Sequence, residues 1–174
     1  MTLTPTQQKF ILHWGEMGTR WGINRTVAQI HALLFIRGTP VPADEIATTL
    51  SVARSNVSTS LRELQAWGLV KVVHVLGDRR DHFETLSDVW AMFKLVLQER
   101  KRREIDPTLA LLREAATQAK KESEVGTSEK LMHMLEFFET AMLGYEEVMK
   151  LSPAALKRAV KYGSKIQRLL GVVS

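Results

Sequence analysis

The 174-residue chain contains no cysteine. Disulfide bonds, thiolate metal sites and cysteine catalysis are therefore excluded. No apolar run approaches the roughly 18 residues of a membrane span, and residues 1–9 lack the basic start and apolar core of a signal peptide. These absences predict a protein without a membrane segment that works in the cytoplasm.

Patterns that indicate an enzyme are also missing. The sequence has neither the glycine-rich fingerprint of dinucleotide sites nor a P-loop, and no Ser, His and Asp set stands in a recognisable context. The five histidines show no compact metal-ligand spacing. We therefore predict no catalytic residue, no metal site and no cofactor. His31 lies on the apolar stripe of a predicted helix and is interpreted as a core histidine whose hydrogen bonds are satisfied.

The chain has the composition of an ordinary globular protein, with 45% hydrophobic and 25% charged residues. Its formal net charge is +5 and its pI about 9.6. This mildly basic balance favours a polyanionic partner. The densest basic run, 100–103, is interpreted as the solvated side of a helix, with phosphate contact as the alternative.

The most informative segment extends from residue 43 to residue 86. Its pattern predicts a helix, a tight turn, a second helix and a two-stranded hairpin, which together form a winged helix-turn-helix. Gly68 is suited to close the second helix in a left-handed conformation. The expected boundaries are a helix from near Pro42, a turn at Ser51–Val52, a helix from about Ala53 to Trp67, strands at 69–76 and 81–86, and an extended piece at 39–41 that can form a third strand.

The two faces of the predicted second helix differ in character. The helical repeat places Val57, Leu61 and Leu64 on one face, which is suited to a core. The opposite face is short-chained and polar, so it can enter a major groove about 12 Å wide. At the hairpin tip, two arginines can reach a phosphate or the minor groove; a charged, solvated surface is the alternative. Residues proposed to read or anchor bases are Ser55, Ser58, Thr59 and Arg62, and those near backbone or minor groove are Arg54, Asn56, Arg79 and Arg80.

The hairpin register bears on the possibility of a metal site. If Leu76 pairs with Asp81, His74 faces Phe83 while His82 pairs with Val75 on the other side of the hairpin. The two histidines then point apart, which argues against zinc.

This order of elements resembles the MarR-type winged helix regulators, whose wing commonly shows Asp-x-Arg. Asp78-Arg79-Arg80 matches that pattern, and the resemblance implies that Arg80 inserts into a groove. More narrowly, residues 20–107 resemble the GbsR branch. The most specific matching phrases are Ser55-Asn56-Val57-Ser58 and Gly77-Asp78-Arg79-Arg80-Asp81.

The GbsR-type resemblance implies control of choline and glycine-betaine genes in some members. Aromatic faces can hold a quaternary ammonium ion by cation–π attraction. Trp14, Trp21 and Trp90 are therefore weak candidates for an effector site, with core packing and helix-end anchoring as the alternative.

Outside the winged segment, helical patterns predict an N-terminal dimerisation helix in 1–22, a DNA-binding domain in 23–88 and a C-terminal helical dimerisation region in 89–174. Apolar stripes that a small domain cannot cover favour a two-fold dimer. The expected helices are Pro5–Trp21, Arg25–Arg37, one from Ser87 or Asp88 that ends or kinks at Asp106-Pro107, one from Thr127 or Ser128 to about Lys150 after a loop at 120–128, and one from Ser152-Pro153. The expected inner stripes are Val89, Phe93, Val96 and Leu97; then Leu131, Met134, Leu135, Phe138 and Met142; then Leu156, Val160, Ile166, Leu169 and Leu170.

The sequence therefore predicts a mainly α protein with a small β-wing, a winged helix-turn-helix plus long dimerisation helices. The predicted function is that of a sequence-specific double-stranded DNA-binding transcriptional regulator. We expect a homodimeric repressor on a palindromic operator, with a small-molecule effector of unknown identity. The alternatives are a winged-helix protein-interaction module and a sequence-independent architectural DNA binder.

Overall fold

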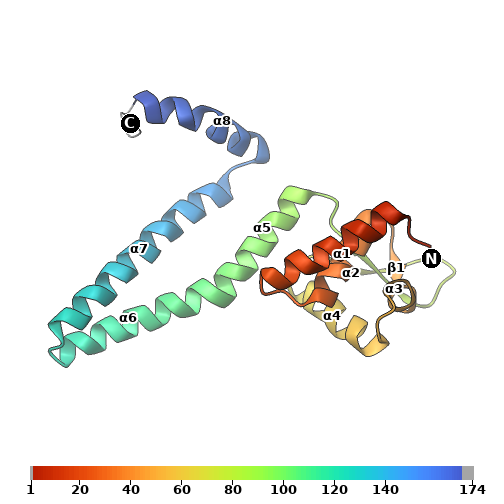
Figure 1. Cartoon of the computed structure of the whole chain (residues 1–174), viewed down its shortest axis with the longest axis horizontal. Coiled ribbons are helices and arrows are strands. Elements are labelled where there is room, and N and C mark those ends of the chain that lie inside the picture. Colours follow the sequence, from red (N-terminus) through yellow and green to blue (C-terminus); the bar gives the residue numbers. More distant parts are fainter. Residues whose placement is uncertain (1, 170–174) are drawn as a thin grey trace. The chain divides into compact units, whose positions relative to one another are not determined.

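The computed structural model describes residues 2–169, and their side chains as far as residue 163. It is mainly helical with one small antiparallel sheet (Figure 1), which confirms the predicted fold class. The chain divides into two compact units, residues 1–97 and 98–174. Within the described residues, no helix has both the length and the apolarity of a membrane crossing.

The elements follow one another without a long linker. The first unit contains α1 (Pro5–Arg20), α2 (Arg25–Arg37), β1 (Val41–Pro42), α3 (Ala43–Leu50), α4 (Arg54–Ala66), β2 (Val70–His74), β3 (Asp81–Thr85) and most of α5 (Val89–Arg100). The second contains a π-helical turn, η1 (Lys101–Ile105), followed by α6 (Asp106–Lys121), α7 (Val125–Lys150) and α8 (Pro153–Leu169).

Local capping sets the ends of the first two helices. Thr4 and Gln7 form a capping box at the start of α1, with reciprocal bonds of 3.3 and 3.0 Å. The Oδ1 of Asn24 accepts from the N–H of Thr26 at 2.8 Å at the start of α2. Gly38 closes α2 with φ of 62°. Each of these caps depends only on residues next to the helix end.

The core of the first unit forms around α2. Ile30, Leu33 and Leu34 of this helix are almost completely buried, together with Ile46 of α3 and Leu61 of α4. Each such side chain contributes about 1.5–3 kcal/mol by leaving water. Burial of α2 on several sides therefore fixes the positions of both helices of the helix-turn-helix.

His31 departs from the prediction. Its Nε2 atom is buried without a hydrogen-bond partner, so the expectation of a fully satisfied histidine is wrong for this atom. Burial lowers the pKa of His31 to about 4, because an apolar environment disfavours the charged imidazolium.

The helix-turn-helix turn is tight. Ser51 adopts a left-handed conformation with φ of 52°, and the N–H of Val52 donates to the carbonyl of Ala47 at 3.0 Å. Pro42 is the N-cap of α3 and not its first helical residue, a shift of one position from the prediction.

The three strands lie in the order β1-β3-β2. The predicted hairpin register is wrong by two residues, because His74, and not Leu76, pairs with Asp81. The tip is longer than expected since the N–H of Asp78 folds back onto the carbonyl of Val75 at 3.1 Å. The two wing histidines nevertheless point to opposite sides, as predicted: His74 is exposed, while His82 pairs with Val73 and is buried.

The apolar stripe predicted for α5 is partly wrong. Val89 and Phe93 are 58% and 48% exposed, whereas Met92 is buried and Leu95 packs against the core. Residues 89–97 are apolar on almost every side, so spacing alone could not identify the inner face. The predicted cap is confirmed, since Asp88 accepts from the N–H of Trp90 at 2.8 Å.

In the second unit, α6 and α7 form an antiparallel hairpin (Figure 1). The interruption expected at Asp106-Pro107 is the π-helical turn η1, after which α6 starts with its proline in the first turn. The loop is shorter than predicted. It covers only residues 122–124, because α6 continues to Lys121 and Ser123 reverses the chain with φ of 61°.

This short reversal changes the start of α7. The helix begins at Val125 with Glu124 as its N-cap, so the predicted caps Thr127 and Ser128 are wrong. Met134 is 52% exposed and lies outside the half-buried face formed by the rest of the predicted stripe.

The hydroxyl of Ser152 caps α8 by accepting from the N–H of Ala155 at 3.2 Å. For the α8 stripe, Val160 is 74% exposed, while the side chains of Ile166 and Leu169 and all of Leu170 lie outside the described residues.

Candidate nucleic-acid interface

Helix α4 presents two contrasting faces. Val57, Leu61 and Leu64 are at most 2% exposed and anchor the helix to the core. The opposite surface carries no large apolar side chain, so solvent or a groove can reach its polar groups. All six helix candidates are exposed in the structure: Arg54, Ser55, Asn56, Ser58, Thr59 and Arg62.

The exposed face of α4 is rich in hydrogen-bond donors. Arg62 donates from Nη2 to the hydroxyl of Thr59 at 3.3 Å, which restrains the guanidinium along the helix. Ala53, the N-cap, offers no side-chain acceptor, so the first-turn N–H groups remain open to an anion. Arg54 in that turn has no hydrogen-bond or ion-pair partner among the described residues. This end of the helix is therefore chemically suited to phosphate.

The wing tip holds its second arginine between carboxylates. The side chain of Asp78 accepts from the backbone N–H of Arg80 and from its Nε, each at 3.0 Å, and also from Nη2. These side-chain and backbone bonds hold the pKa of the Asp78 carboxyl well below its ordinary range. Arg79 is exposed and has no hydrogen-bond or ion-pair partner among the residues that the structure describes.

A second carboxylate reaches Arg80 from the helix-turn-helix. Asp44 of α3 accepts from Nη1 of Arg80 at 2.8 Å, which joins the wing to the first helix of the motif. Burial raises the pKa of Asp44, but the hydrogen bond and the positive charge of Arg80 more than offset this, so the pKa lies below its ordinary value. Both carboxylates are therefore ionised at neutral pH.

His82, a buried residue of β3, stabilises the wing tip. Its ring Nδ1 donates to the backbone carbonyl of Arg80 at 2.9 Å, and its Nε2 lies 3.4 Å from a carboxylate oxygen of Asp78. Only 6% of His82 is exposed. The buried imidazole of His82 thus fixes the base of the wing tip, while the outer side of the tip remains exposed to solvent.

The sequence did not identify Asp44 as part of this site. Strand β1 explains its actual position: Pro42 pairs with His82, so the residues that follow Pro42 lie beside those that precede His82. A third strand next to the wing was predicted, but its register was not.

The effector candidates are dispersed over two helices. Trp14 stacks on Phe10 with ring centroids 5.4 Å apart, and Trp90 meets Phe93 edge-on at 6.4 Å. Trp21 is the C-cap of α1.

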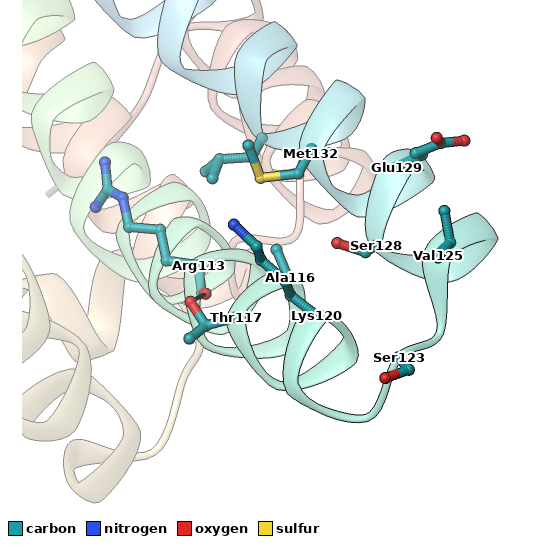
Figure 2. Close-up of a pocket in the computed structure, with 10 residues that line it drawn as sticks. Arg113, Ala116, Thr117, Lys120, Ser123, Val125, Ser128, Glu129 and Met132 are labelled. Atoms are coloured by element: carbon teal, nitrogen blue, oxygen red, sulfur yellow. Dashed lines mark hydrogen bonds between the residues drawn. The ribbon is translucent and has the colours of Figure 1, made fainter.

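Near the reversal between α6 and α7 lies an open cavity of about 660 Å³, and Figure 2 shows Ala116, Lys120 and Met132 among the residues that line it. No tryptophan lines this cavity. Among the described residues, no group of three or more His, Asp or Glu side chains could hold a metal ion.

The arrangement defines a winged helix of the kind that binds duplex DNA, with a polar helix face beside an arginine-bearing wing. Residues 21–81 match the sequence model of the MarR family. A solved structure described as "Crystal Structure of a transcriptional regulator" is similar over 82% of this chain and 99% of that chain, with 20% identity and a TM-score of 0.54. No curated protein matches the chain.

The winged segment is therefore similar to the MarR family over residues 21–81, and this match supports a DNA-binding transcriptional regulator. The resemblance noted in the sequence is confirmed at the level of this family. The solved structure supports the fold, including helices beyond the matched segment.

Proposed function

We propose that the protein is a homodimeric repressor that recognises a palindromic site in double-stranded DNA. The observation that carries this proposal is the exposed, small and polar face of α4, which lies in the same compact unit as the arginines of the wing. Ser55, Thr59 and Arg62 can reach base edges, and Arg62 has the geometry for bidentate bonds to guanine. Arg54, Arg79 and Arg80 supply charge for the backbone and the minor groove.

The exposed face of α4 argues against a protein-interaction module. Such a module needs an apolar docking face, whereas this surface consists of hydroxyl, amide and guanidinium groups. A sequence-independent architectural binder would use the same basic groups. It differs by having equal affinity for all duplexes, which binding measurements can decide.

Exposed apolar side chains on the helices outside the motif support the dimer. Leu12 and Trp14 of α1 are 49% and 42% exposed, and Phe137 of α7 is 68% exposed. A two-fold dimer would place two copies of α4 about 34–36 Å apart, one turn of DNA, on a palindromic site. Such a regulator would act in the cytoplasm, where it meets DNA.

An effector would regulate binding by favouring one dimer geometry over another. Membership of the GbsR branch and a quaternary ammonium ligand remain part of this proposal. They are supported by the matching phrases in the sequence and by the three exposed or half-buried tryptophans Trp14, Trp21 and Trp90.

The wing assignment is tested with Arg80→Ala. We expect weaker DNA binding, with a salt slope of log affinity reduced by about 1 if Arg80 contacts a phosphate. Circular dichroism and thermal unfolding check that the fold survives. Unchanged binding at physiological salt would remove Arg80 from the interface.

A further inference from the structure

The positive charge of the chain is concentrated in residues 148–174. Six of the 24 lysines and arginines lie there, and none of the 19 acidic residues does. Residues 1–147 therefore hold 18 basic and 19 acidic residues, a formal net charge of −1, so the whole excess of +5 comes from residues 148–174. The basic balance that favours a polyanionic partner is thus a property of this segment.

Helix α8 presents part of this charge on one side. Lys157, Arg158 and Lys161 are all exposed, and the helical repeat places them within about 100° of one another. In the sequence, Lys165 and Arg168 continue the same spacing, although their side chains lie outside the described residues. These three described side chains are here called the α8 basic side.

The α8 basic side is not neutralised by carboxylates of its own chain. Lys157 and Arg158 have no hydrogen-bond or ion-pair partner among the described residues. The ammonium of Lys161 lies 6.0 Å from the ring centroid of Tyr162, and no carboxylate of the described residues bonds it. Within the part of the chain that the structure describes, no other element packs extensively against α8. The charges are therefore open to an external anion.

The densest basic run of the chain, 100–103, differs in this respect. Each of its four bases lies 2.6 to 3.7 Å from a carboxylate of Glu99, Glu104 or Asp106. An external phosphate would have to compete with these internal partners. Of the two basic clusters, the α8 basic side is therefore the better suited to bind a polyanion, even though its sequence is less dense in charge.

We propose that the α8 basic side binds the phosphate backbone of DNA, in addition to the contacts of the winged motif. Lys157 and Lys161 are separated by about 6 Å along the helix axis, close to the roughly 7 Å that two phosphate steps of one strand cover. Such contacts add affinity without sequence preference. This inference rests on the DNA binding of the proposed function and extends it to the second unit.

The apolar residues of α8 favour DNA over an anionic lipid surface. A helix that lies in a membrane surface buries bulky residues such as tryptophan, phenylalanine and leucine. Residues 153–174 contain neither tryptophan nor phenylalanine. The larger apolar side chains described in α8 are Leu156, which is half-buried, Val160 and Tyr162. Positive charge is thus the main feature that this helix offers, and a phosphate backbone requires nothing more.

The test combines Lys157→Gln, Arg158→Gln and Lys161→Gln in the full chain, because glutamine keeps a high helix propensity. Fluorescence anisotropy with a shuffled duplex gives the slope of log affinity against log salt. We expect this slope to become less steep by about 2–3, since each phosphate contact contributes about 0.9. The loss of affinity should then be roughly 15- to 60-fold larger at about 50 mM than at about 200 mM salt.

The matched control combines Arg100→Gln, Arg102→Gln and Arg103→Gln, which removes the same charge from bases that carboxylates of the chain already hold. Its slope should change by less than about 1. Circular dichroism checks that both proteins keep their helices. Equal slope changes in the two variants would show a general effect of net charge and overturn the proposal, as would an unchanged slope in the α8 variant.

Two further measurements separate the alternatives. The α8 variant should lose affinity equally for selected and shuffled duplexes, and a fall in their ratio would contradict a pure backbone contact. Binding to phosphatidylglycerol vesicles that depends on α8, with an unchanged slope on DNA, would assign the helix to a lipid surface and overturn the proposal. Wild type without sequence preference would remove the proposed specific regulator while a persisting slope difference kept the α8 contact. Absence of any duplex binding would overturn both.

Discussion

Arg80 is bonded on three of its nitrogens by carboxylates of its own chain, with Asp78 on Nε and Nη2 and Asp44 on Nη1. A guanidinium has five N–H donors, so two remain for an external acceptor. The carboxylates orient the side chain, and they also place negative charge close to where phosphates would lie. Asp44 therefore has two opposing effects on DNA binding, which a single variant can separate.

We predict that Asp44→Asn raises affinity for random duplex, because one repelling charge is lost near the phosphates. On a preferred site the freed arginine loses its orientation, so the ratio of preferred-site to random affinity should fall about two- to fivefold, as for an exposed ion pair. Fluorescence anisotropy with both duplexes measures this ratio.

The control is Asp81→Asn, which removes the same charge from an exposed position on the wing that does not contact Arg80. It should raise both affinities together and leave the ratio unchanged. Equal changes of the ratio in the two variants would show that Asp44 acts only through its charge.

His31 makes the stability of the protein depend on pH. Its pKa is 6.5 in the ordinary case and about 4 in the fold, so the unfolded chain binds the proton more readily. The stabilisation is complete above pH 6.5 and is lost as the pH falls towards 4, amounting to about 3 kcal/mol over this interval. Urea unfolding of wild type and His31→Leu between pH 7.5 and 4.5 tests this. The variant should lose less stability on acidification, and parallel curves would contradict the assignment.

At the scale of elements, the contact between α1 and α2 depends on the absence of a side chain. A Cβ on Gly18 would lie 2.5 Å from the Cβ of Ala28, and one on Gly15 would lie 2.6 Å from the flexible side chain of Gln29. Alanine improves helix propensity by up to about 1 kcal/mol at either position. Only at Gly18 must a helix backbone shift to accept it.

We therefore predict that Gly18→Ala lowers the free energy of unfolding by roughly 1–3 kcal/mol through overpacking. Gly15→Ala should cost less than Gly18→Ala, because the overlap at Gly15 is with the side chain of Gln29, which can rotate, and not with a Cβ fixed to the backbone. Thermal and urea unfolding of the two variants give the comparison. A Gly18→Ala protein as stable as wild type would mean that the two helices separate at little cost.

The ends of α1 and α2 were predictable because their causes are local. The capping box at Thr4, the Asn24 cap and the left-handed Gly38 each depend on a few adjacent residues. Predictions of the helix face and of the strand register were wrong where contacts between residues distant in the sequence determine the structure. The face of α5 is selected by the core it meets, and the hairpin register by the bonds of Asp78 at the tip.

The candidate DNA-binding site also has one part that local sequence predicts and one part that distant contacts determine. The polar face of α4 follows from the helical repeat, so its exposed residues were predictable from spacing. The contact of Asp44 with Arg80 joins residues 36 positions apart, through the pairing of β1 with β3. The buried position of His82 likewise depends on that pairing.

At the scale of the whole molecule, the two compact units would have different functions. The first contains α4 and the wing, which would contact DNA, and the second contains the α6–α7 hairpin. Neither part alone would read a palindrome. A dimer doubles the contacts and fixes their separation at about one turn of DNA, so specificity should require the full chain.

Sequence-specific binding depends on whether α4 reads base sequence. The direct measurement is to select preferred duplexes from a random pool with the full chain, and then to compare affinities of wild type and Arg62→Ala for a selected and a shuffled duplex at physiological salt. Wild type should prefer the selected duplex by about 10³-fold or more. Arg62→Ala should lose about 1–3 kcal/mol on that duplex and much less on the shuffled one. Equal affinity of wild type for the two duplexes would contradict the account.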